Sequence, residues 1–93
     1  MLIGTLQIEL YIPGTGSLKE KRFVLKSIKT KIQNSFNVSI AEVDFLDKWQ
    51  RSTLGIACVA NENRFIDETL SKVIRTISKD YRVEIINQLI EIL

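Results

Sequence analysis

Hydrophobic and polar residues alternate along the first twelve positions of the chain. The apolar side of this alternation consists of Leu2, Leu6, Ile8, Leu10 and Ile12, with Gly4 among them. The polar residues Thr5, Gln7 and Glu9 lie between them. A period of two is typical of a β-strand with one buried face. We therefore predict a strand over Leu2–Ile12.

A helix is predicted directly after this strand. Pro13-Gly14-Thr15-Gly16 breaks the alternation, and Ser17 to Glu20 then has the S-x-x-E spacing of a capping box. On a helical wheel one apolar arc contains Leu18, Val24, Leu25, Ile28, Ile32 and Phe36. The polar run Asn34 to Asn37 indicates where the helix ends.

The second half of the chain predicts two strands, a helix and a last strand. Val38–Phe45 and Thr53–Ala60 are β-rich runs joined by the polar segment LDKWQRS, so they predict a hairpin with a long connection. Asn61 or Asn63 is expected to cap a helix with the core stripe Ile66, Leu70, Val73, Ile74 and Ile77. Val83–Leu93 is the last predicted strand.

The order β-α-β-β-α-β is that of the ferredoxin-like fold, an α+β architecture. In this fold a four-stranded antiparallel sheet carries both helices on one face. The length of 93 residues fits a single domain covering 1–93, with a core that buries about 60% of the unfolded surface.

The composition excludes most catalytic chemistries. The chain has no His, so Ser-His-Asp and Cys-His nucleophile pairs and HExxH metal sites are absent. Its one cysteine, Cys58, can form neither an internal disulfide nor a zinc site, and it lies in an apolar run typical of a buried strand. The segment GTGSLK lacks the third glycine of a dinucleotide fingerprint. We expect no metal, no cofactor and no catalytic residue.

The predicted first helix is strongly basic. Residues 17–37 contain six Lys or Arg and one Glu, although the whole chain has a net charge of only +2. The wheel places Lys19, Arg22, Lys26 and Lys29 on one stripe, which is a candidate site for RNA or another anion. Alternatively, the stripe is a solvated helix face whose lysine stems cover the edge of the core. Lys21 lies inside the apolar arc, and we expect its amine to emerge at the helix end.

Two further groups are candidates for contacts. Phe23, Trp49 and Arg51 are candidate stacking or docking residues, because an aromatic side chain among charges is often exposed. The alternative for Trp49 is an indole folded back over the end of the sheet. The acidic residues Glu42, Asp44 and Asp47 either hold a metal, act in acid–base chemistry, or pair with Lys48 and Arg51.

Three segments resemble a known family when taken together. SLKEKR after a strand and a Pro-containing turn, then FNVSIAEV, then DKWQRSTLG resemble the YlxP-like family of small bacterial proteins, nearly end to end. The resemblance implies a ferredoxin-like fold and a bacterial cytoplasmic protein whose genes often lie among those for translation initiation and ribosome maturation factors. It implies no established activity. Phe23 departs from the family, which often has another basic residue there.

The sequence therefore favours a non-enzymatic accessory protein, associated with RNA or the ribosome through its first helix. The alternative is a homodimeric protein-interaction or small-ligand-binding module. This alternative rests on the edge strands and on a flat open sheet face around Gly55, Ala57 and Val59. For assembly we predict a homodimer formed through the exposed sheet face or an edge strand, because a single core of this size is only moderately stable. A carboxylate-based enzyme is a third class. The N-terminus lacks a basic n-region and a cleavage site, which predicts a cytoplasmic protein without a membrane segment.

Overall fold

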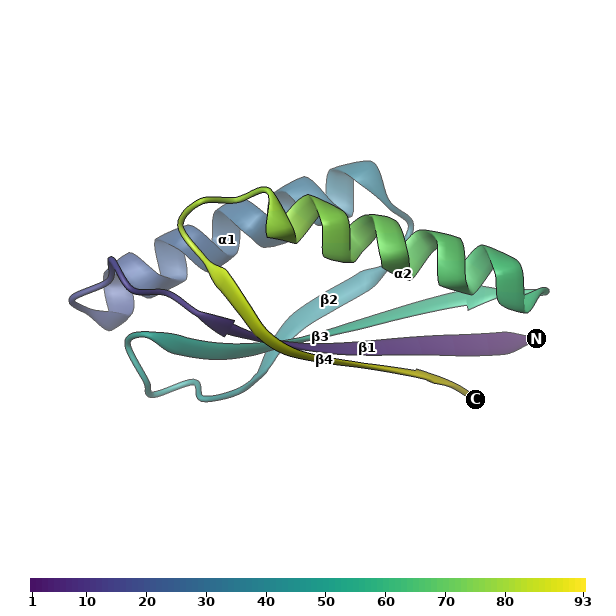
Figure 1. Ribbon diagram of the computed structural model, residues 1–93, viewed down its shortest axis with the longest axis horizontal. Helices are drawn as coiled ribbons and strands as arrows, with labels where there is room; N and C mark the ends of the chain where they lie inside the picture. The colour runs from purple at the N-terminus through teal and green to yellow at the C-terminus, as the bar shows by residue number, and fades with distance from the viewer.

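The computed structural model describes residues 1–93 and contains four strands and two helices. In chain order these are β1 (Leu2–Tyr11), α1 (Leu18–Ser35), β2 (Ser39–Asp44), β3 (Arg51–Ala60), α2 (Asn63–Ser78) and β4 (Glu84–Ile92). The strands form one sheet in the order β2-β3-β1-β4, and each neighbouring pair is antiparallel. Both helices lie on the same face of the sheet (Figure 1). The predicted ferredoxin-like fold is confirmed.

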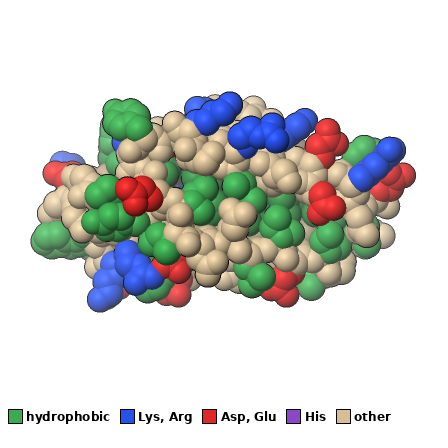
Figure 2. Space-filling view, viewed as in Figure 1, with side chains coloured by type: hydrophobic (Ala, Val, Ile, Leu, Met, Phe, Trp, Pro, Cys, Tyr) green, Lys and Arg blue, Asp and Glu red, His purple; other side chains and the backbone are tan.

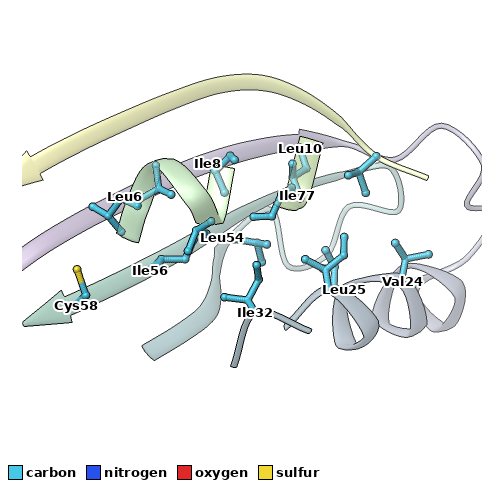
Figure 3. Close-up of a cluster of buried hydrophobic side chains, with 14 of the residues drawn as sticks. Leu6, Ile8, Leu10, Val24, Leu25, Ile32, Leu54, Ile56, Cys58 and Ile77 are labelled. Atoms are coloured by element: carbon cyan, nitrogen blue, oxygen red, sulfur yellow. The ribbon is translucent and has the colours of Figure 1, made fainter. Parts of the chain in front are cut away.

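The core lies between the helices and the two central strands. Leu6, Ile8 and Leu10 of β1 are fully buried, as the alternation predicted. Ile8 lies opposite Leu54 of β3 in the sheet register. Val24, Leu25 and Ile32 of α1 and Ile77 of α2 point toward these strands (Figure 3). Cys58 is buried in the same cluster, and desolvation raises the pKa of its thiol despite an opposing hydrogen bond from the Gly4 backbone.

The start of α2 differs from the sequence prediction. We predicted a cap from Asn61 or Asn63, but Glu62 occupies the N-cap position and its side chain makes no capping hydrogen bond. The carboxylate of Glu62 instead accepts a hydrogen bond from Nε of Arg64 at 2.6 Å. The predicted core stripe of this helix is correct except that Ile74 is only partly buried.

At Gly4 the helix α2 packs tightly against the sheet. A Cβ atom added at Gly4 would lie 2.2 Å from Cγ2 of Ile66, which is fully buried. Ile66 has no room to move away because it belongs to the core cluster. The absence of a side chain at position 4 therefore sets the distance between α2 and β1.

We predict that Gly4→Ala lowers the free energy of unfolding by about 1–3 kcal/mol, because the added methyl group overpacks the contact with Ile66. Gly14→Ala is the matched control, since nothing lies within 4 Å of a Cβ at that position. Urea unfolding followed by circular dichroism measures both. Equal stability of the two variants would show that α2 shifts freely.

Candidate nucleic-acid interface

The N-terminus of α1 has the predicted capping arrangement, with one difference. The hydroxyl of Ser17 accepts a hydrogen bond from the backbone N–H of Glu20 at 3.1 Å. The carboxylate of Glu20 reaches back to the N–H of Gly16 at 2.7 Å, one residue before the N-cap that a standard capping box uses. The two bonds fix the chain direction as it enters α1.

The basic residues of the predicted stripe lie on the solvent side of α1. Lys19, Arg22 and Lys26 are exposed and Lys29 is partly exposed, whereas Val24 and Ile28 of the same helix are buried. The structure contains five ion pairs, and none of them involves these four residues. We call this set, Lys19, Arg22, Lys26 and Lys29, the α1 stripe. Its charge is not neutralised within the chain.

A hollow of about 800 Å³ lies beside the first two turns of α1. Its walls come from the β1–α1 loop, from α1 itself and from the α2–β4 loop. Two aromatic side chains line it, Phe23 of α1 and Tyr81 of the α2–β4 loop, with 72% and 94% of their surfaces exposed. Lys19 also lines the hollow, so the hollow and the α1 stripe are adjacent.

Hydrogen bonds of the α2–β4 loop hold Tyr81 beside α1. The Asp80 carboxylate accepts hydrogen bonds from the backbone N–H, Nε and Nη2 of Arg82, at 2.7 to 3.0 Å. The side-chain hydrogen bond from Arg82 keeps the pKa of Asp80 below its usual value and outweighs the effect of burial. Arg82 also donates to the hydroxyl of Ser27 on α1 at 3.0 Å. Tyr81 lies between these two anchored residues.

Sequence reasoning missed Tyr81. The signal was present, because Tyr81 lies among Lys79, Asp80 and Arg82 much as Trp49 lies among charged residues. Its nearness to Phe23 depends on the contact between the α2–β4 loop and α1, which are far apart in the sequence, and periodicity does not reveal such a contact.

Lys21 lies inside the protein, contrary to the prediction that its amine emerges at the helix end. The side chain is fully buried. Its Nζ is 2.9 Å from the Glu42 carboxylate and donates to the backbone carbonyls of Phe45 and Arg51 at 2.8 and 3.1 Å. An ammonium group has three N–H donors, so these three acceptors satisfy it. The carbonyl of Leu46, at 3.5 Å, is a more distant fourth contact.

The Lys21 contacts join the three segments that resemble the YlxP-like family. Lys21 belongs to SLKEKR, Glu42 to FNVSIAEV, and Arg51 to DKWQRSTLG. Ser52, which is also in the third segment, donates its hydroxyl to Glu42 at 2.8 Å. We call Lys21, Glu42 and Ser52, with the carbonyls of Phe45 and Arg51, the Lys21 network. Much of the sequence signature is therefore structural.

The β2–β3 loop is shaped by this network. Phe45 has a φ of 60°, the left-handed region that non-glycine residues rarely adopt. This conformation is stabilised by hydrogen bonds on both sides, because the Asp44 carboxylate accepts from the N–H of Phe45 at 2.7 Å and Lys21 donates to its carbonyl. The hydroxyl of Thr15 donates to the carbonyl of Trp49 at 2.6 Å and ties the loop to the β1–α1 loop.

Trp49 and Arg51 have different environments. Trp49 is 54% exposed and lines a shallow depression of about 510 Å³ together with Tyr11 and Phe45. Arg51 forms an ion pair with Glu9, and its guanidinium lies 4.4 Å from the centre of the Phe45 ring. The guanidinium of Arg51 therefore already has partners within the chain, whereas the side chain of Trp49 is accessible.

The acidic residues Glu42, Asp44 and Asp47 do not form a shared site. Glu42 belongs to the Lys21 network and Asp44 bonds to the backbone of Phe45. The structure has no group of three or more His, Cys, Asp or Glu side chains arranged to hold a metal ion. The alternative that these acids pair with Lys48 and Arg51 is not observed either, because Glu42 pairs with Lys21 and Arg51 pairs with Glu9.

Comparison with known proteins agrees with the resemblance seen in the sequence. A family model described as "Protein of unknown function (DUF503)" matches residues 3–90. The chain belongs to this family. It is 43% identical over 83 residues to "Uncharacterized protein YlxP" of Bacillus subtilis (strain 168), a match that covers 89% of this chain and 90% of that protein.

The fold of this DUF503 member also matches a solved structure. A de novo designed protein with a ferredoxin fold, determined in solution by NMR, aligns with a TM-score of 0.60 at 13% sequence identity. The alignment covers 100% of this chain and 84% of the designed protein. It supports the fold alone. No helix in the DUF503 chain is both long and apolar enough to cross a membrane.

We predict that Lys21→Met destabilises the domain by about 3 kcal/mol, because it leaves the Glu42 carboxylate without its counter-ion and the inward carbonyls of Phe45 and Arg51 without their donor. Lys26→Met removes the same charge from an exposed position of α1 and should change stability by less than about 0.5 kcal/mol. Urea unfolding measures both free energies. Lys21→Met with parental stability would show that the buried ammonium is dispensable.

Proposed function

We propose that this protein binds single-stranded RNA, alone or as an accessory factor on a ribosomal particle. The α1 stripe contacts successive phosphates, and the hollow beside Phe23 and Tyr81 receives an unstacked base. The observation that carries the proposal is the set of four cations on one helix face with no acidic partner in the chain. The role is binding, and we assign no catalytic residue.

The distribution of ion pairs supports this use of α1. On α2, Lys72 pairs with Glu68 and Arg64 pairs with Glu62, so two cations of that helix are already compensated. On α1 the only ion pair is the buried one of Lys21. The charge of α1 therefore projects into solvent, where it attracts a polyanion and releases its counterions.

The lining of the hollow favours a base over a phosphate. Glu20 lines the hollow and carries a negative charge that would repel a phosphate placed there. Phe23 and Tyr81 offer ring surfaces on which a nucleobase stacks, as in proteins that bind single strands with little sequence preference. Since Lys19 contacts both regions, a strand running along α1 can place a phosphate on Lys19 and the adjacent base in the hollow.

The α1 stripe makes a quantitative prediction about salt. Four phosphate contacts should give a slope of about −3 for the logarithm of affinity against the logarithm of salt concentration, at roughly −0.7 per contact on single strands. Replacing Lys26 and Lys29 together by Gln should lower the affinity and reduce the slope to about −1.4. Fluorescence anisotropy with a labelled single-stranded RNA measures both quantities.

The control for this prediction removes the same charge from the other helix. Arg75 and Lys79 lie exposed at the end of α2 and form no ion pair, and their joint replacement by Gln should leave the salt slope unchanged. Circular dichroism checks that both double variants are folded. If the two double variants lose affinity equally, net charge rather than the α1 stripe attracts RNA, and the proposal is wrong.

The aromatic residues make a prediction that is independent of salt. Phe23→Ala and Tyr81→Ala should each weaken RNA binding by about 1–3 kcal/mol, and this loss should persist at high salt because stacking does not depend on counterions. Tyr81→Phe should retain the affinity. Phe65→Ala is the control, because Phe65 is exposed on α2 and does not line the hollow. Unchanged affinity in both Ala variants would contradict base binding in the hollow.

A further inference from the structure

The strand β4 forms an edge of the sheet and carries exposed hydrophobic side chains. Ile86, Leu89, Ile90 and Ile92 are between 37% and 54% exposed, and Leu93 beyond the strand is 70% exposed. Figure 2 shows hydrophobic side chains reaching the surface across the middle of the face below α2, where Figure 1 places β4. A long apolar edge strand of this kind is a template for pairing with another strand.

The two edges of the sheet are protected to different degrees. The opposite edge, β2, has six residues, a register shift after Glu42, and Glu42 itself turned inward to Lys21. Short length, a bulge and an inward charge all discourage pairing. On β4 the irregularity is confined to the first residues, around Ile86, and Asn87–Ile92 pairs regularly with β1. The protective features are therefore concentrated on β2.

The free main-chain groups of β4 can be assigned from its pairing with β1. Leu93 and Ile3 exchange both of their backbone hydrogen bonds, at 2.8 and 3.4 Å. Since hydrogen-bonded and non-hydrogen-bonded positions alternate along an antiparallel pair, Gln88, Ile90 and Ile92 direct their N–H and C=O groups away from β1. The Gln88 N–H is satisfied locally, by the side chain of Asn87 at 2.9 Å. That side chain can turn aside when a strand is added.

We infer that β4 pairs with β4 of a second copy of this chain, in antiparallel register about a two-fold axis at Leu89, and joins two sheets into one of eight strands. In this register Leu89 faces Leu89 of the second copy on the open side of the sheet, and Glu91 faces Asn87. On the helix side Ile90 faces Gln88 and Ile92 faces Ile86. No acid faces an acid.

Neighbouring registers match the two copies less well. Moving the axis to Ile90 places Glu91 opposite Leu89 and Ile92 opposite Gln88. Moving it to Gln88 places Glu91 opposite Ile85 and Glu84 opposite Ile92. Both shifts put carboxylates against aliphatic side chains, which disfavours burial. The axis at Leu89 matches an apolar residue with an apolar one and a polar residue with a polar one at most positions.

The experiment compares two exposed residues on the open side of the sheet. Sedimentation of the parent chain at micromolar concentration should give twice the 10.7 kDa mass of one copy. Leu89→Lys places two like charges at the axis and should give a folded monomer. Val59→Lys, at a 63% exposed position of the inner strand β3, should remain dimeric. A monomeric parent chain, a dimeric Leu89→Lys or a monomeric Val59→Lys would each overturn the inference.

A cysteine variant tests the register directly. Leu89 is a non-hydrogen-bonded position toward the second copy, where Cα atoms lie about 4.5 Å apart, within the range that a disulfide spans. Leu89→Cys should therefore form a covalent dimer on mild oxidation, read on a non-reducing gel. Ser39→Cys, exposed on the other edge strand, should stay monomeric on the gel. Cys58 is buried and does not interfere. Absence of the Leu89 cross-link would contradict this register.

Discussion

The buried ammonium of Lys21 is the constraint on which one whole end of the molecule depends. A charge taken out of water is tolerated only when it is paired and its hydrogen bonds are made. Lys21 meets this condition through Glu42 and two backbone carbonyls, which come from β2, the β2–β3 loop and the start of β3. Those segments must therefore take up the positions that the ammonium requires. To meet that requirement Phe45 adopts a left-handed backbone conformation. The loop tolerates this conformation because the inward-facing carbonyl of Phe45 accepts a hydrogen bond from Lys21.

This arrangement separates the basic residues of α1 into two roles. Lys21 holds the helix to the sheet, while the α1 stripe remains in solvent on the same helix. Within its six residues, the segment SLKEKR therefore provides a helix cap, a buried lysine that anchors the helix to the sheet, and exposed positive charge. The resemblance of this segment to the YlxP-like family is therefore not by itself evidence for a surface contact. What supports the α1 stripe as a contact surface is its exposure and its lack of acidic partners, and neither depends on the SLKEKR motif.

The sequence predicts what depends on local periodicity, and it fails where distant segments meet. Alternation located β1, and the helical wheel found the buried residues of both helices, because each signal lies within one element. The wheel also placed Lys21 on the apolar side correctly. The expectation that its amine emerges was wrong because the acceptors come from β2, the β2–β3 loop and β3, more than twenty residues away, and no local pattern encodes their path. Tyr81 was missed for the same reason, since the bond from Arg82 to Ser27 that holds that loop against α1 joins residues 55 positions apart. At the start of α2 the cap prediction failed because the helix begins at Asn63, which puts Glu62 and neither asparagine at the N-cap.

The positions of the helices connect the two proposals. α1 packs over β2 at one edge of the sheet, while α2 covers β1 and β3 and reaches β4 at the other edge (Figure 1). The apolar edge and the α1 stripe therefore lie on opposite sides of the domain. Pairing through β4 would leave the stripe of each copy facing outward, away from the two-fold axis. Two separated binding surfaces on one rigid sheet would engage a single RNA at two places, and the second contact would then form at a high effective concentration. A weak contact on each copy would in this way add up to firm binding on a folded RNA that presents two suitably spaced single strands.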